Sequence, residues 1–371
     1  MNCAPWWLGL VIGLLAACSE APRESPLKLN DLQVVATHNS YKQAIDPALL
    51  RLLSAEFGDV INGLDYAHAP LRDQLDAGIR KLELDVFHDP EGARYAAPRG
   101  LALLQGAGLP AADWNAESML APGMKVMHVQ DIDFRSHCPT LERCLAELRE
   151  WSEAHPDHLP IAVSVNAKDA TLDDPNATVP LPFDTAAWAA LDAEIVAGLR
   201  AERLLRPDDV RGNRETLREA VLADGWPALD ALRGRFLFVL DEPMAKLAGY
   251  LEDHPALAGR VMFANVPEAH PAAGFLIIND PLAEGKRIRE AVQAGFSVRT
   301  RADADTLEAR RGDTRRRDAA FASGAHFVST DYPSADPRFG TDYAVRLPGG
   351  GSARCNPVRR AEGCLLEAER D

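Results

Sequence analysis

Short apolar runs alternate along the chain with stretches of helical periodicity. Runs that fit buried or half-buried strands span residues 32–37, 80–86, 124–129, 160–166, 235–240, 261–264, 275–278, 296–299 and 326–329. Between several of them, apolar positions recur at helical spacing, over residues 141–154, 185–205, 285–294 and 314–322. Because strands that alternate with helices are typical of βαβ units, the pattern predicts an α/β protein with a parallel sheet.

The number of these runs favours a (β/α)8 TIM-type barrel. The chain has 371 residues, and such barrels typically occupy about 250 residues or more. A barrel needs eight strands, so one of the runs 261–264 and 275–278 is expected to be an extra or edge element. A doubly wound sheet is the alternative architecture, and it usually has fewer strands.

The two ends of the chain differ from the middle. Residues 1–17 carry no charged side chain and are largely apolar, as in a signal peptide. They end in Leu-Ala-Ala before Cys18, which resembles a bacterial lipoprotein processing site and predicts an exported protein anchored to a membrane through lipidated Cys18. Soluble secretion is the alternative. We expect a tether at 18–29, the barrel at 30–335 and an extension packed on the barrel at 336–371.

The cysteines agree with an exported protein, and the net charge argues against one class of partner. Cys138 and Cys144 form one close pair and Cys355 and Cys364 another, which favours disulfides in an exported protein over reduced or zinc-bound thiols. The formal net charge is −15. This charge argues against nucleic acid as a partner, because phosphate backbones bind basic surfaces. We expect a monomer.

Polar residues gather where the predicted strands end. His38 and Asn39 follow the first strand, Glu83 and Asp85 share one face of the second, and Asn166 ends the fourth. His128 lies at the end of the third run, and Lys168 follows the fourth. A single histidine at a strand end is usually structural. Because barrel strands end at one mouth, where active sites form, the co-location of these side chains favours function.

These residue types suit a phosphodiester. Carboxylate and amide oxygens form a cage for Ca²⁺ or Mg²⁺, which would neutralise charge on the phosphate. Two histidines can divide the proton transfers between attack and departure. A Zn²⁺ hydrolase is disfavoured because no zinc-type histidine or cysteine cluster is present.

Five segments together resemble the calcium-dependent phosphatidylinositol-specific phospholipase C family. They are residues 37–41 (THNSY), 71–80 (LRDQLDAGIR), 82–86 (LELDV), 298–303 (VRTRAD) and 328–333 (VSTDYP). The resemblance covers roughly residues 30–335 and implies the phospholipase C-like barrel. It also implies metal-dependent cleavage of phosphatidylinositol-type diesters, in which an inositol hydroxyl attacks phosphorus.

The resemblance assigns roles by position. The catalytic histidines would be His38 and His128, and the calcium ligands Asn39, Glu83 and Asp85, with Mg²⁺ as the second candidate metal. The family usually has an acidic ligand where this chain has Asn166. An amide oxygen still binds Ca²⁺, but with one negative charge fewer the affinity should be lower.

Four further residues are candidates for holding the substrate: Lys168, Arg299, Arg301 and Asp331. The basic ones would contact the phosphate or headgroup, and Asp331 a sugar hydroxyl. Surface ion pairing, or helix capping for Asp331, is the alternative. Two other functions stay open. The first is a glycerophosphodiester phosphodiesterase, which shares the barrel but normally has His-Arg-Gly at the first strand, where this chain has His38-Asn39-Ser40. The second is a non-catalytic headgroup-binding lipoprotein, which would need no pair of histidines.

Overall fold

The structure is a computed structural model that describes residues 26–360, 364 and 366. The expected signal peptide, Cys18 and the tether up to residue 25 lie outside the described residues. Across the described part of the chain, no helix has both the length and the apolar character needed to cross a membrane.

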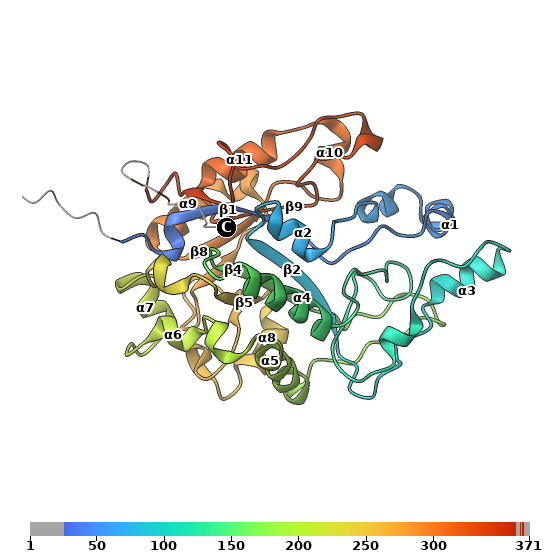
Figure 1. The fold of residues 1–371 in the computed structure, drawn as a ribbon, viewed down its shortest axis with the longest axis horizontal. Coiled ribbons are helices and arrows are strands. Elements are labelled where there is room, and N and C mark those ends of the chain that lie inside the picture. The colour runs from blue at the N-terminus through green and yellow to red at the C-terminus, as the bar shows by residue number, and fades with distance from the viewer. Residues whose placement is uncertain (1–25, 361–363, 365, 367–371) are drawn as a thin grey trace, which may run out of the picture.

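Eight parallel strands form a nearly closed barrel, as expected (Figure 1). Their order around the sheet is β6-β5-β4-β2-β1-β9-β8-β7. Where β6 and β7 meet, the gap is bridged by a side chain, since Asn265 Oδ1 accepts a hydrogen bond from the Ile277 amide at 2.9 Å. The strands are β1 (Leu32–Thr37), β2 (Lys81–Phe87), β4 (Ile161–Ala167), β5 (Phe236–Leu240), β6 (Phe263–Ala264), β7 (Phe275–Ile277), β8 (Ser297–Arg301) and β9 (Phe327–Thr330).

The prediction of which run is extra was wrong. Both 261–264 and 275–278 contribute barrel strands, whereas the run 124–129 forms β3 (Lys125–Val126), which pairs antiparallel with the end of β2. Lys125 also forms a bridge with Thr140, so the chain folds back here instead of crossing the barrel. Alternation of apolar residues reports a half-buried strand but says nothing about its direction or its partner.

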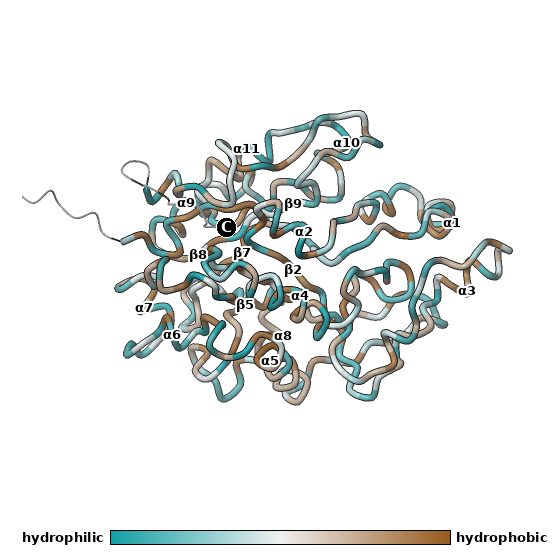
Figure 2. The backbone as a smooth tube through the Cα atoms, in the orientation of Figure 1, coloured by the Kyte–Doolittle hydropathy of each residue, from teal (hydrophilic) through white to brown (hydrophobic). Residues whose placement is uncertain are grey.

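Helices surround the barrel and extend from one side of it. In Figure 1, α4, α5, α8, α9 and α11 lie around the strands, whereas α1 and α3 lie beyond the end of β2. Figure 2 shows hydrophobic colouring along the central strands and hydrophilic colouring over the outer loops. The helices are α1 (Pro47–Phe57), α2 (Leu71–Asp76), α3 (Arg99–Gly106), α4 (Leu141–Ala154), α5 (Thr185–Leu199), α6 (Pro207–Arg211), α7 (Leu217–Ala223), α8 (Met244–Leu251), α9 (Pro281–Ala294), α10 (Leu307–Arg311) and α11 (Arg315–Ser323).

Side-chain caps explain where the longer helices begin. The Thr140 hydroxyl accepts from the Arg143 amide at the start of α4, and Asp280 accepts from two amides at the start of α9. Each cap satisfies main-chain donors that have no partner inside the helix. Helix α9 is followed by Gly295, whose φ of 113° lies in the left-handed region that favours glycine.

A second apolar cluster supports the lobe that contains α1 and α3. It includes Leu49, Leu53, Leu104 and Phe134, and it packs on Phe87, the last residue of β2. Since strand ends point to the mouth of the barrel, this lobe stands beside the mouth.

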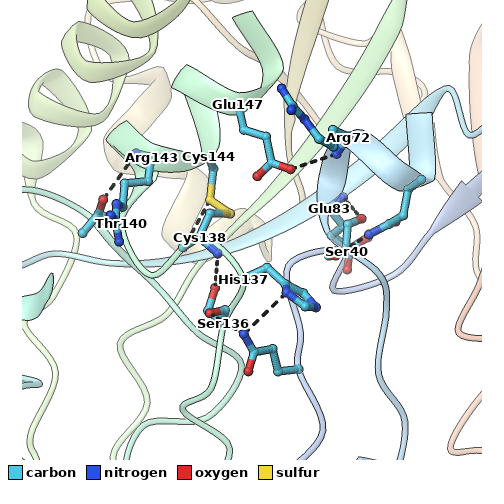
Figure 3. The surroundings of a disulfide bond; sticks show 12 residues. Ser40, Arg72, Glu83, Ser136, His137, Cys138, Thr140, Arg143, Cys144 and Glu147 are labelled. Atoms are coloured by element: carbon cyan, nitrogen blue, oxygen red, sulfur yellow. Dashed lines mark hydrogen bonds between the residues drawn. A yellow bond between two sulfur atoms is a disulfide. The ribbon is translucent and has the colours of Figure 1, made fainter. Parts of the chain in front are cut away.

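The carboxyl-terminal extension contacts the barrel at several points. Strand β10 (Arg354–Cys355) pairs antiparallel with the start of β1, and the Val345 amide donates to the Tyr332 carbonyl at 2.9 Å. Both expected disulfides are present, Cys138–Cys144 beside the start of α4 (Figure 3) and Cys355–Cys364 in the extension.

Candidate active site

Strand β2 supplies the acidic residues of the barrel interior. Lys81, Glu83 and Asp85 alternate along the strand, so their side chains share one face, and all three are buried. The parallel register with β4 places Asp85 opposite Asn166. The loop after β1 is also hydrogen-bonded to β2, because the Glu83 amide donates to Ser40 Oγ at 2.8 Å (Figure 3). Residues distant in sequence thereby converge on one mouth.

Glu83 divides its two carboxylate oxygens between different neighbours. Oε2 accepts from Lys81 Nζ at 2.9 Å and from Arg299 Nη2 at 3.0 Å. Oε1 lies 3.4 Å from Asn166 Nδ2 and 3.5 Å from His38 Nε2. Burial alone would raise the pKa of Glu83, but attraction to Lys81 and Arg299 outweighs it and holds that pKa well below its usual range. Glu83 is therefore charged at neutral pH.

Arg299 is enclosed in the barrel. Besides Glu83, its guanidinium donates to Asn279 Oδ1 at 2.6 Å and to Ser329 Oγ at 3.1 Å. Only 2% of its side chain is exposed. Its geometry suits holding Glu83 in place more than reaching a substrate.

Asp85 has one paired oxygen and one unpaired oxygen. Its Oδ2 lies 3.2 Å from Lys168 Nζ, and Asp85 is the largest cause of the raised pKa of Lys168. Its Oδ1 is buried and has no hydrogen bond of good geometry among the described residues, and the same holds for the hydroxyl of Tyr41. Tyr41 is nonetheless a neighbour, because burial and then Asp85 raise the pKa of Tyr41. A buried carboxylate oxygen without a donor is costly, and a bound cation would satisfy it.

His38 forms a dyad with Asp331. Its Nδ1 lies 2.8 Å from Asp331 Oδ1, and Asp331 Oδ2 accepts from Arg301 Nη2 at 2.9 Å. Burial lowers the pKa of His38, and Arg301 lowers it further, against the opposing effect of Asp331. Burial would raise the pKa of Asp331, but His38 and Arg301 lower it to about 2. A neutral His38 then donates from Nδ1 to the charged Asp331 and leaves Nε2 as a free base.

His128 forms a second dyad, with Asp133. Its Nδ1 lies 2.7 Å from Asp133 Oδ2, and the other oxygen of Asp133 lies 3.1 Å from the fully buried Lys42 Nζ. Sequence reasoning missed both Asp133 and Lys42. The one signal in the sequence was that Asp133 comes five positions after His128. In the structure this stretch is a turn, closed by the bridge between Val129 and Asp133.

Tyr66 links the two dyads and was also missed. Its hydroxyl lies 3.3 Å from His38 Nδ1, and its ring centroid lies 6.1 Å from that of His38 and 6.5 Å from that of His128. Asn39 donates from Nδ2 to the Tyr66 hydroxyl at 2.7 Å, which leaves Asn39 Oδ1 available as a ligand. The φ of Asn39 is 49°, a left-handed conformation that asparagine tolerates better than most residues.

The donor set fits a hard cation held weakly. The candidate oxygens are Asp85 Oδ1, Glu83 Oε1, whose hydrogen bond from Asn166 is long at 3.4 Å, and the amide oxygens of Asn39 and Asn166. Oxygen ligands of this kind suit Ca²⁺, and the unpaired Asp85 oxygen is the observation that favours one. Within the described ranges, no group of three or more His, Cys, Asp or Glu side chains could hold a metal. A cation would thus depend on the amides as well as the carboxylates.

Comparison with known proteins gives a family and two similar folds. The family described as "Phosphoinositide phospholipase C, Ca2+-dependent" matches residues 27–357. A calcium-dependent phosphoinositol-specific phospholipase C from a Pseudomonas species is 16% identical, with a TM-score of 0.53 over 88% of this chain and 95% of that one. A Ca²⁺-dependent phosphatidylinositol-specific phospholipase C from Streptomyces antibioticus is 20% identical, with a TM-score of 0.52 over 82% and 94%. No curated protein sequence matches.

Proposed function

Because the chain belongs to the Ca²⁺-dependent phosphoinositide phospholipase C family, we propose that it cleaves phosphatidylinositol-type diesters into a diacylglycerol and a cyclic inositol phosphate. The observation that carries the proposal is the pair of dyads, His38–Asp331 and His128–Asp133, which both lie next to the Tyr66 ring at one barrel mouth. A protein that only bound headgroups would need no such pair of proton-transfer groups.

His38 is proposed as the base. Its Nε2 would accept the proton of the inositol 2-hydroxyl while that oxygen attacks phosphorus. Asp331 accepts from Nδ1, fixes the tautomer and stabilises the imidazolium that forms. The low pKa of His38 keeps Nε2 unprotonated at neutral pH.

His128 is proposed as the acid. Asp133 engages its Nδ1 and leaves Nε2 to protonate the glycerol oxygen as the bond from that oxygen to phosphorus breaks. The diacylglycerol leaves with this proton, and the attacking oxygen stays bonded to phosphorus in the cyclic product. The substrate loses one proton to His38 and gains one from His128, and proton exchange with water returns both histidines to their starting states.

Asn39, Glu83, Asp85 and Asn166 are the residues that would hold calcium, with Mg²⁺ as the alternative. When bound there, the ion would neutralise charge on the phosphate oxygens and ease deprotonation of the attacking hydroxyl. Arg301, 15% exposed beside Asp331, remains a proposed phosphate contact. Arg299 is reassigned to positioning Glu83, since its Nη1 and Nη2 both donate to groups inside the barrel.

Export and anchoring through Cys18 are part of the proposal. They rest on the apolar residues 1–17 and on the two disulfides, which persist in oxidising compartments. Replacing Cys18 by alanine should release the protein from membranes into the soluble fraction. A variant that stayed with the membranes would contradict lipidation.

The experiment is turnover of phosphatidylinositol and glycerophosphoinositol with Ca²⁺, Mg²⁺ or a chelator. The His38→Ala variant should lose roughly 10²- to 10⁴-fold in rate. His270→Ala is the matched control, because His270 lies on the loop before β7, where its Nδ1 accepts from the Ala272 amide at 3.1 Å. Equal rates for the two variants would refute the role of His38.

A further inference from the structure

We propose that Lys168 competes with the calcium ion for Asp85 and thereby sets how much calcium the site needs. The inference rests on the proposed function in one respect, namely that a cation binds these oxygens. It explains why a site with the right oxygens is also rich in positive charge.

The two acidic ligands differ in how their positive partners are held. Glu83 is paired with Lys81 and Arg299, whose side chains are 0% and 2% exposed and fixed inside the barrel. Asp85 is paired with Lys168, whose side chain is 33% exposed. A flexible, partly exposed lysine can move away from its partner, whereas an enclosed cation cannot.

The backbone directs Lys168 toward the site. Lys168 comes directly after β4 and two positions after Asn166, and its amide donates to the Val86 carbonyl at 2.7 Å. Asn166 itself lies opposite Asp85 in the register of β2 and β4. The chain therefore has a neutral amide at the ligand position and a lysine directly beyond it.

Calcium and the lysine ammonium would share one carboxylate. The ammonium lies at Asp85 Oδ2, and the unpaired Oδ1 of the same carboxylate is the oxygen open to the ion. Charges of like sign this close repel strongly in a partly buried site. Calcium affinity follows the charge of the ligand set, and weak sites have dissociation constants of about 10⁻⁴ to 10⁻³ M, as in extracellular modules. We place this site in that range.

The test is direct calcium binding by titration calorimetry, with no substrate present. Lys168→Met should tighten binding by roughly tenfold or more, because the competing charge is gone. Lys168→Arg keeps the charge and should bind as the wild type does. Lys246→Met is the matched control, since Lys246 pairs with Asp169 at 2.8 Å and Glu242 at 3.5 Å instead of a candidate ligand.

A double-mutant cycle separates competition at Asp85 from a general charge effect. In an Asp85→Asn background, Lys168→Met should no longer tighten calcium binding. Thermal unfolding of each variant verifies that it is folded. The inference is overturned if Lys168→Met binds no more tightly than Lys246→Met, if the gain persists without Asp85, or if no variant binds calcium. Because binding is measured without turnover, an inactive protein that binds calcium, and binds it more tightly as Lys168→Met, would refute the proposed function and leave this inference standing.

Discussion

Replacing Asp331 by asparagine should impair catalysis more than binding. Asp331 Oδ1 accepts from His38 Nδ1 at 2.8 Å, and its other oxygen accepts from Arg301 at 2.9 Å. An asparagine can hold similar space, but its amide can turn an N–H toward Nδ1. The ring would then carry its proton on Nε2, the atom that must act as the base.

The size of the effect follows from the charge and the tautomer that Asp331 fixes. Burial would raise the pKa of Asp331, but His38 and Arg301 lower it, so the carboxylate is charged at neutral pH and asparagine removes that charge. Loss of the correct tautomer adds a further penalty, and in a comparable triad it lowers kcat by about 10⁴. We therefore expect kcat to fall by roughly 10³- to 10⁴-fold.

The assay is kcat and KM for a soluble phosphatidylinositol analogue at saturating calcium. KM should change little, because Asp331 is proposed to act through His38 and not to hold the substrate. Asp336→Asn is the matched control. It removes the same charge from a carboxylate that lies near the surface and pairs with Arg338. A fall in kcat of less than about tenfold, or a rise in KM alone, would refute the role assigned to Asp331.

Three other changes test contacts that stabilise the fold. Tyr343→Phe removes the hydroxyl that donates to Asp303 at 3.1 Å, and should lower the free energy of unfolding by about 1 kcal/mol in denaturant titrations; an unchanged midpoint would show that this contact with the extension adds nothing. Opening Cys138–Cys144 with paired serines should cost about 2 kcal/mol, given its short loop, and equal thermal stability would contradict this. Burial lowers the pKa of His326 to about 3. Because the unfolded chain binds more protons between about pH 6.5 and 3, stability should fall by up to about 1.4 kcal/mol per pH unit on acidification through that window, and His326→Gln should flatten this slope.

The fold was largely predictable because its signal is local. Each barrel strand is a short apolar run, and α4 was predicted with the bounds that the structure has, Leu141–Ala154. The direction of β3 was not predictable, because pairing depends on the partner strand and on the chain folding back at Thr140. Two-residue strands such as β6 leave little pattern by which to choose between candidates.

The site was predictable where its residues lie at strand ends. His38, Glu83 and Asn166 were expected at one mouth, and in the structure His38 Nε2 and Asn166 Nδ2 each lie within 3.5 Å of Glu83 Oε1. Tyr66 and Lys42 were not foreseen, because each reaches the site from a loop or a turn. The change in the role of Arg299 has a similar cause. Its position in the sequence does not show whether an arginine is exposed at the mouth or is buried and paired with Glu83.

The measurement that tests the central claim most directly is ³¹P NMR of phosphatidylinositol cleavage by the purified protein, with calcium and with chelator. The account predicts the signal of a cyclic inositol phosphate, dependent on calcium and lost in His38→Ala. Release of glycerol 3-phosphate from glycerophosphoinositol, with no cyclic product from either substrate, would contradict attack by the inositol hydroxyl.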